Sequence, residues 1–258
     1  MQFAGAKLKV QRAKKHIREL QSLLDSWIDT NPYQVSVNED AKTGLNYVSL
    51  EVTQTIPDDI ALVIGDVIHN FRSVLDFIAY EIVTAAGGSG NRVYFPFEGD
   101  RDSLKASSKY TTIKSVSKKA ASLILDTIKP YKTGNYTLWA LNKIDNIDKH
   151  RLLIPSIQVV SITVDAVDDN QNQFINNTIS LGGAGKINAF RSASKFHITR
   201  YGKPYFNIFF GPGTFFDAEP IPETFMKIGR EVSKVIALFE KARLGMKPKP
   251  IGLGFSRP

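Results

Sequence analysis

The sequence predicts an α+β fold: a helical bundle built on a long central helix, with an N-terminal β-hairpin and an antiparallel β-sheet region. Apolar residues recur at three- and four-residue steps over residues 1–150 and again over 223–243, which is the helical period. Between 151 and 215 the pattern changes to alternation at every second residue, which is typical of strands. We therefore expect one α+β domain over residues 1–244, followed by a basic tail rich in Pro and Gly at 245–258.

The N-terminal part predicts a helix followed by a hairpin. Apolar residues between 5 and 28 follow the helical period, and Pro32 ends this helix because the residue before a proline is pushed out of the α region. Residues 33–37 and 45–53 then alternate apolar and polar side chains across a turn, which predicts a β-hairpin.

Residues 57–86 predict the longest helix. Pro57 and two acidic residues suit its first turn, and Gly87-Gly88 can end it. We expect one continuous helix that buries an apolar stripe, namely Ile64, Val67, Phe71, Val74 and Ile78.

The remaining elements are predicted from the spacing of apolar residues and from the positions of Pro and Gly. Residues 88–109 read as a loop, in which the apolar piece 93–97 packs as an extended cover. Helices are predicted at 115–129, closed by Pro130, and at 135–149. The predicted strands are 159–167, 174–181, 189–200 and 205–211, with a turn at Gly182-Gly183.

Composition excludes several classes of protein. With 43% hydrophobic and 22% charged residues, the chain is not disordered or low in complexity. The absence of Cys excludes disulfides, thiolate nucleophiles and Cys-ligated metals. No apolar run reaches the ~20 residues of a membrane span, and the N-terminus lacks the apolar region of a signal peptide. We expect a cytoplasmic protein that does not contact a membrane.

The net charge of +8 is unevenly distributed. Cations cluster in residues 1–20, in 101–132 and in the last 18 residues, whereas residues 55–85 hold five acids and only Arg72. Such clusters can bind phosphate backbones, or they can be solvated helix faces. The sequence alone leaves both interpretations open.

A polar stripe lies on the long predicted helix. His69, Arg72, Ser73 and Asp76 are spaced so that their side chains share one face, next to Asn70. Such a face can combine a proton acceptor with a cation that stabilises charge on phosphate oxygens. The alternative is a purely structural network in which Arg72 pairs with Asp76.

A second polar segment covers residues 142–151. Asn142, Asp145, Asn146 and Lys149 share a helical face, and Asp148, His150 and Arg151 lie beside them. It can be a structural corner, since cations suit the end of a helix, or part of a site. We expect the two segments to meet, with Arg72 or Asp76 near Asp145, Asp148, Lys149 or His150.

These two segments supply the candidate site. The predicted catalytic residues are His69, Arg72, Asp76 and His150. The predicted ligand-binding residues are Asn70, Ser73, Asn142, Asp145, Asn146, Asp148, Lys149 and Arg151. We predict no metal or cofactor, since no motif such as HExxH is present, and no Ser-His-Asp triad, since Ser73 lies within a helix and not on an exposed elbow.

The segments Gly65–Asp76 and Leu141–Arg151 resemble those of an uncharacterised bacterial protein family of similar length. More remotely, the polar-striped helix is similar to the motif helix of the HEPN superfamily. That resemblance implies a helical bundle, metal-independent cleavage of RNA in a defence or toxin system, and a site built across a homodimer. Arg72 matches the motif Arg, but Phe77, Ile78 and Ala79 stand where the family has its His, so His69 or His150 would have to replace it.

Three functions remain open from the sequence. The protein can be a HEPN-like RNA endonuclease, a non-catalytic binding or sensing protein for a nucleotide or other anionic ligand, or a structural module. RNA or a nucleotide is the expected ligand in the first two. The departure from the His position of the motif favours the second. The Arg72 stripe, the basic first helix and the resemblance place the first ahead of it.

Overall fold

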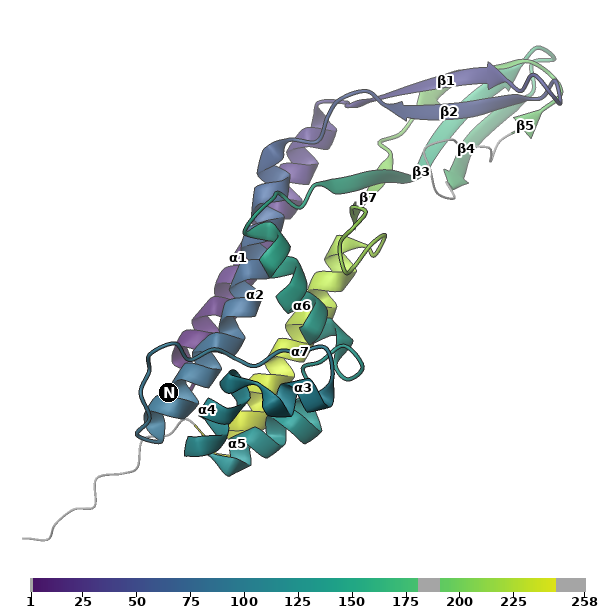
Figure 1. Ribbon diagram of the computed structural model, residues 1–258. Coiled ribbons are helices and arrows are strands. Elements are labelled where there is room, and N and C mark those ends of the chain that lie inside the picture. The colour runs from purple at the N-terminus through teal and green to yellow at the C-terminus, as the bar shows by residue number, and fades with distance from the viewer. Residues whose placement is uncertain (1, 181–190, 245–258) are drawn as a thin grey trace, which may run out of the picture. The chain divides into compact units, whose positions relative to one another are not determined.

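The computed structural model describes residues 2–180 and 191–244, and over these ranges the chain has the expected α+β fold (Figure 1). Contacts divide it into two compact units. The helical unit comprises Met1–Ile17, Gly65–Arg151 and Thr224–Pro258, and the sheet unit comprises Arg18–Ile64 and Leu152–Glu223. A single domain over 1–244 stays a prediction. The tail 245–258 and the turn at Gly182-Gly183 lie outside the described residues.

Two long helices each contribute to both units. Helix α1 is Ala4–Asp29 and helix α2 is Asp58–Ala85, so the single continuous helix predicted near 57–86 is confirmed. At 28 residues α2 is the longest helix described. Its predicted apolar stripe is at most 1% exposed, which confirms the face that we assigned to the core.

The region after α2 differs from the prediction. Residues 88–100 form no helix, as predicted, but in place of a loop over 101–109 and one helix over 115–129 the chain forms four short helical segments. These are α3 (Arg101–Ala106), α4 (Ser108–Val116), α5 (Lys118–Ser122) and the π-helix η1 (Leu123–Ile128).

Serine caps explain these breaks. Ser107 accepts the N–H of Tyr110 (3.2 Å), and Ser117 accepts the N–H of Ala120 (3.2 Å). Each serine thus satisfies a backbone donor that a new helix leaves unpaired, and so starts a helix inside an otherwise periodic segment. The extended cover over 93–97 is confirmed, since Phe95 and Phe97 are buried.

Two further helices are α6 (Tyr136–Asp148) and α7 (Ile221–Lys241), close to the bounds predicted for them; α7 belongs to the helical unit from Thr224 onward. Helix α7 passes close to α2 at Gly229, where an added Cβ would lie 3.3 Å from the Phe71 ring. The ring therefore fills the space that a larger residue at 229 would need.

The sheet unit contains two antiparallel sheets. The first has the order β1-β2-β5, and its hairpin confirms the predicted one. In the second, the long strand β3 pairs with β4, β6 and β7. The strands are β1 (Tyr33–Glu39), β2 (Asn46–Val52), β3 (Pro155–Asp168), β4 (Gln173–Ser180), β5 (Arg191–Ser192), β6 (Phe196–Tyr201) and β7 (Tyr205–Phe210).

One predicted strand, 189–200, is not continuous. Its described part forms β5 and β6, separated by residues 193–195. The break occurs because β5 pairs with β2 in the first sheet, whereas β6 pairs with β3 in the second. Val48 and Leu50 of the first sheet share one buried cluster with residues of the second, so the core of this unit lies between its sheets.

No helix among residues 2–180 and 191–244 is long and apolar enough to cross a membrane.

Candidate functional site

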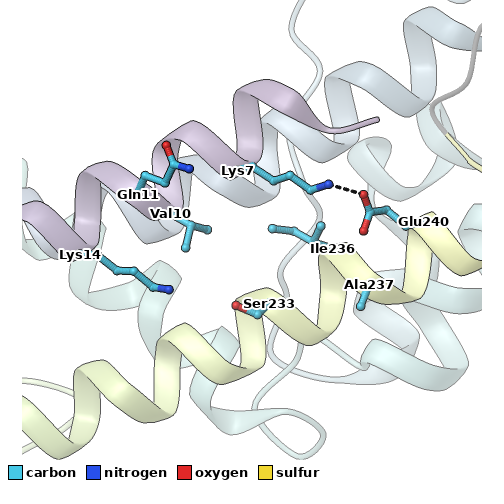
Figure 2. A pocket seen from close by; sticks show the side chains of 8 residues that line it. All are labelled: Lys7, Val10, Gln11, Lys14, Ser233, Ile236, Ala237 and Glu240. Atoms are coloured by element: carbon cyan, nitrogen blue, oxygen red, sulfur yellow. Dashed lines mark hydrogen bonds and ion pairs between the residues drawn. The ribbon is translucent and has the colours of Figure 1, made fainter. Parts of the chain in front are cut away.

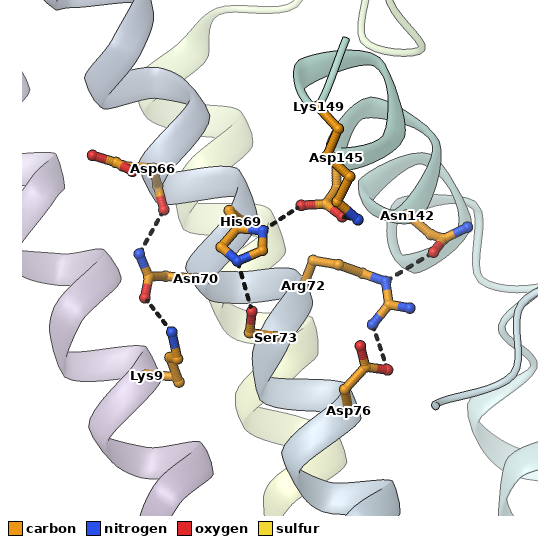
Figure 3. A network of polar contacts seen from close by, with 10 residues as sticks. All are labelled: Lys9, Asp66, His69, Asn70, Arg72, Ser73, Asp76, Asn142, Asp145 and Lys149. Atoms are coloured by element: carbon orange, nitrogen blue, oxygen red, sulfur yellow. Dashed lines mark hydrogen bonds and ion pairs between the residues drawn. The ribbon is translucent and has the colours of Figure 1, made fainter. Parts of the chain in front are cut away.

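Helices α2 and α6 of the helical unit bring the two predicted polar segments together (Figure 3). Arg72 Nε donates a hydrogen bond to Asn142 Oδ1 (2.8 Å), and His69 Nδ1 lies 3.0 Å from Asp145 Oδ1. The two segments meet, as predicted, but through other pairs than the predicted ones. Arg72 contacts Asn142, and His69, not Arg72 or Asp76, reaches Asp145.

His69 is held by a buried carboxylate. Asp145 is 1% exposed and accepts from both His69 and Lys149, whose Nζ lies 2.6 Å from Oδ2. Because a carboxylate can only accept, His69 Nδ1 carries the proton. Nε2 then accepts from the Ser73 hydroxyl at 3.4 Å. The imidazole side chain is 52% exposed, so its orientation is fixed while it remains accessible.

Further carboxylates surround this pair. The pKa of Asp148 is raised by burial, and also by the negative charges of Asp145 and Asp66, which outweigh the opposite effect of His69 and Lys149. Asp148 occupies the space beside Gly65, where a Cβ would overlap its carboxylate. The surroundings of His69 are therefore acidic, with Lys149 as the neighbouring cation.

Arg72 has a different environment from the one expected. The residue is 7% exposed, and its guanidinium stacks on the Phe97 ring, 4.5 Å from the ring centroid. Nη1 lies 2.8 Å from Asp76 Oδ1, an ion pair without good hydrogen-bond geometry. Asp76 also accepts the backbone N–H of Phe95 (2.8 Å). Arg72 and Asp76 thus tie α2 to α6 and to the 93–97 cover, and this burial leaves Arg72 no open face for a phosphate.

The other predicted residues divide into two groups. The Asn70 amide donates to the Asp66 carbonyl of its own helix (2.8 Å) and accepts from Lys9 Nζ of α1 (3.3 Å). Asn146, His150 and Arg151 are exposed at or beyond the end of α6. Within the described residues, no side-chain contact brings these three into the network.

Sequence reasoning missed the aromatic and backbone partners of Arg72 and Asp76. The sequence did contain an indication of these partners. When an apolar segment covers polar side chains, it must offer them hydrogen bonds or ring contacts, because buried polar groups need partners. The distance in sequence between residues 72 and 97 concealed which groups would do so.

The contacts Ser73–His69–Asp145 follow the order of a nucleophile, base and orienting acid. Acyl transfer also requires donors for an oxyanion. Ser73 lies inside α2, where backbone N–H groups are used by the helix itself. This location supports a general base at His69 but no acyl-transfer site. Residues 2–180 and 191–244 contain no group of three or more acidic or His side chains that could hold a metal ion.

A separate groove lies between α1 and α7 (Figure 2). It encloses about 340 Å³ and is lined by apolar and polar side chains, and Lys7 pairs with Glu240 across it (2.5 Å). The lining residues are Lys7, Val10, Gln11, Lys14, Ser233, Ile236, Ala237 and Glu240. None of them belongs to the predicted site, so this groove is separate from the candidate site around His69.

Comparison with known proteins finds no protein family model, curated protein or solved structure that matches this chain. The resemblance to the HEPN superfamily and to the bacterial family stays a prediction. The candidate site therefore depends on the geometry of its own residues.

Proposed function

We propose that the protein is a HEPN-like, metal-independent RNA endonuclease whose general base is His69. One observation carries this proposal: the imidazole is half exposed, and buried Asp145 fixes its Nδ1. This arrangement leaves Nε2 as the proton acceptor, which is what a general base requires. His69 thereby takes the place of the His that the HEPN motif has after its Arg, and Arg72 becomes a positioning residue.

In this proposal Nε2 of His69 takes the proton of a ribose 2′-hydroxyl. The O2′–P bond forms as the P–O5′ bond breaks, which gives a 2′,3′-cyclic phosphate, and the leaving O5′ regains a proton from the imidazolium or from water. Lys149 Nζ, half exposed beside Asp145, is the cation placed to face the negative oxygens. No metal or cofactor takes part.

The distribution of charge between the two units supports a polyanionic substrate. The helical unit carries 26 Lys and Arg against 11 Asp and Glu, whereas the sheet unit carries 7 against 14. The formal charges are thus +15 and −7. The unit that holds His69 attracts phosphate backbones. RNA as substrate and the absence of Cys both suit a cytoplasmic location, which we include in the proposal.

The test is cleavage of single-stranded, structured and transfer RNA in EDTA. We expect wild-type protein to cleave at least one of them and His69→Ala to lower the rate by roughly 10²- to 10⁴-fold. The matched control is His197→Ala, which removes an exposed His from β6 in the sheet unit. Circular dichroism melts must show that both variants fold.

Two results would contradict the proposal. Loss of activity in EDTA would show a metal-dependent reaction. Loss on His150→Ala with full activity of His69→Ala would place the base at the end of α6.

Binding without cleavage is the second candidate function, and the charge of +15 on the helical unit favours it. Wild-type protein that binds RNA or a nucleotide and leaves every RNA intact would support this alternative. In that case His69→Ala would change neither binding nor product.

A further inference from the structure

The surroundings of His69 cannot by themselves hold an RNA chain. Asp66, Asp145 and Asp148 place three carboxylates around one lysine and one imidazole. Like charges repel a phosphate. If this unit binds RNA, the attraction must come from another part of its surface.

The strongest basic surface of the unit is the segment 105–132, here called the lysine segment. Its seven lysines are all exposed: Lys105, Lys109, Lys114, Lys118, Lys119, Lys129 and Lys132. Within residues 2–180 and 191–244 none of the seven forms an ion pair, and the nearby Asp126 is already paired with Arg101 (2.7 Å). Lys119 donates to the Ala242 carbonyl (2.9 Å) and Lys132 lies over the Trp139 ring, but no ion pair neutralises any of the seven charges within these residues.

A polar hollow and an aromatic residue lie where this segment meets α6. The hollow encloses about 400 Å³ and is lined by Thr127, Lys129, Asn135, Tyr136, Thr137 and Glu231, among others. Burial raises the pKa of Glu231, but hydrogen bonds from Lys234 and Asn135, together with the charges of Lys234 and Arg230, lower it overall.

Tyr136 is 39% exposed, and its ring lies 5.5 Å from that of Trp139. Lys132 and Lys143 each place Nζ within 5.7 Å of the Trp139 ring. The Trp139 ring beneath these two cations is buried, so Tyr136 is the ring that can take a stacked base. Exposed lysines around such a ring suit single-stranded nucleic acid, because phosphates contact the lysines while a base stacks on the ring.

We infer that the lysine segment and Tyr136 form the surface that holds single-stranded RNA. Tyr136 begins α6 and Asp145 lies nine residues further along the same helix. At 1.5 Å per residue the two positions are about 14 Å apart along the helix axis, a distance that one extended strand can span. The inference rests on the proposed function for its ligand, but it concerns binding and not chemistry.

The experiment measures the affinity of a fluorescein-labelled oligouridine of about 20 nucleotides at several salt concentrations. All variants are made in His69→Ala protein, so that cleavage does not interfere. The test variant replaces Lys109, Lys114 and Lys118 with Gln. The control variant makes the same change of charge in the same unit, at the exposed residues Arg12, Lys15 and Lys241.

We expect the test variant to bind at least about tenfold more weakly, and the slope of log K against log salt to become shallower by about 2. The control should retain most of the affinity. Tyr136→Ala should bind about 5- to 100-fold more weakly, whereas Tyr136→Phe keeps the ring and the affinity.

Equal losses in the two triple variants would overturn the inference, because binding would then depend on net charge alone. The absence of any binding to oligouridine, or tighter binding of oligothymidine DNA, would also overturn it. Equal affinity of Tyr136→Ala and Tyr136→Phe would overturn the stacking role. Cleavage by wild-type protein together with unaffected binding by the test variant would reject this surface and retain the nuclease. Weaker binding by the test variant without any cleavage by wild-type protein would retain the surface and reject the nuclease.

Discussion

Burial changes the role of Arg72. The guanidinium meets Asn142, Asp76 and the Phe97 ring within the helical unit. A lysine keeps the charge there, but it lacks Nε and the planar group that stacks on the ring. Arg72 therefore helps to hold α2 in place against α6.

We expect Arg72→Lys to lower the free energy of unfolding by about 1–3 kcal/mol, measured by urea denaturation. The control is Arg101→Lys, which alters an exposed ion pair with Asp126 and should cost less. If Arg72→Lys is as stable as wild type but no longer cleaves RNA, this role is contradicted, and Arg72 would instead act by contacting the substrate.

The protonation of Asp148 makes the stability of the folded protein depend on pH. Its pKa is raised in the folded protein by burial and by Asp145 and Asp66, so folding favours the neutral acid. The stabilisation is complete below the unfolded pKa of about 4 and is lost as the pH rises through the folded pKa.

An amide at this position imitates the neutral acid. Asp148→Asn should therefore melt at a higher temperature than wild type at about pH 7, with a smaller difference at about pH 4. Asp169→Asn removes the same charge from an exposed position and serves as the control. A difference in melting temperature that grows as the pH falls would contradict the assignment.

In helix α2 the spacing of apolar residues was sufficient to predict which face is buried. Phe71 is 1% exposed, and its ring packs against α7 at Gly229. Phe71→Ala should cost about 3–5 kcal/mol of unfolding free energy, since it removes a buried ring and leaves a cavity.

Leu62→Ala is the comparison for that measurement, because Leu62 lies on the same helix but is 51% exposed. It should cost much less than Phe71→Ala. Similar losses at both positions would show that the buried face of α2 has been assigned wrongly.

The four short helical segments after α2 show where periodicity is insufficient. Their total apolar content resembles that of one helix, but Ser107 and Ser117 start new ones. A serine inside a helical pattern can face solvent or act as a cap. Packing decides between the two, and a local pattern does not contain that information.

For the whole molecule the relevant property is the separation of charge between its units. A unit with a charge of +15 should accelerate encounter with RNA, and salt should screen this effect. We expect the association rate constant, measured by stopped-flow fluorescence, to fall several-fold from about 50 to 200 mM NaCl. A rate that does not depend on salt would show that charge does not guide binding.

A homodimer stays a prediction. A site built across that dimer would place the polar stripe of one chain against that of the other, but Arg72 is buried under Phe97 within the single chain.

The sequence by itself determined the α+β class, the long helix with its buried stripe, the hairpin and the two polar segments. The spacing of apolar residues and the effects of Pro and Gly on the backbone depend only on nearby residues, so they can be recognised in a single sequence. Only the tertiary structure decided which polar residues meet. It buried Asp145 and Arg72, oriented His69 and left His150 outside, because these outcomes depend on contacts between residues about 70 positions apart in the chain. Charge and spacing indicate which residues can take part in a site, but burial and distance determine which of them do.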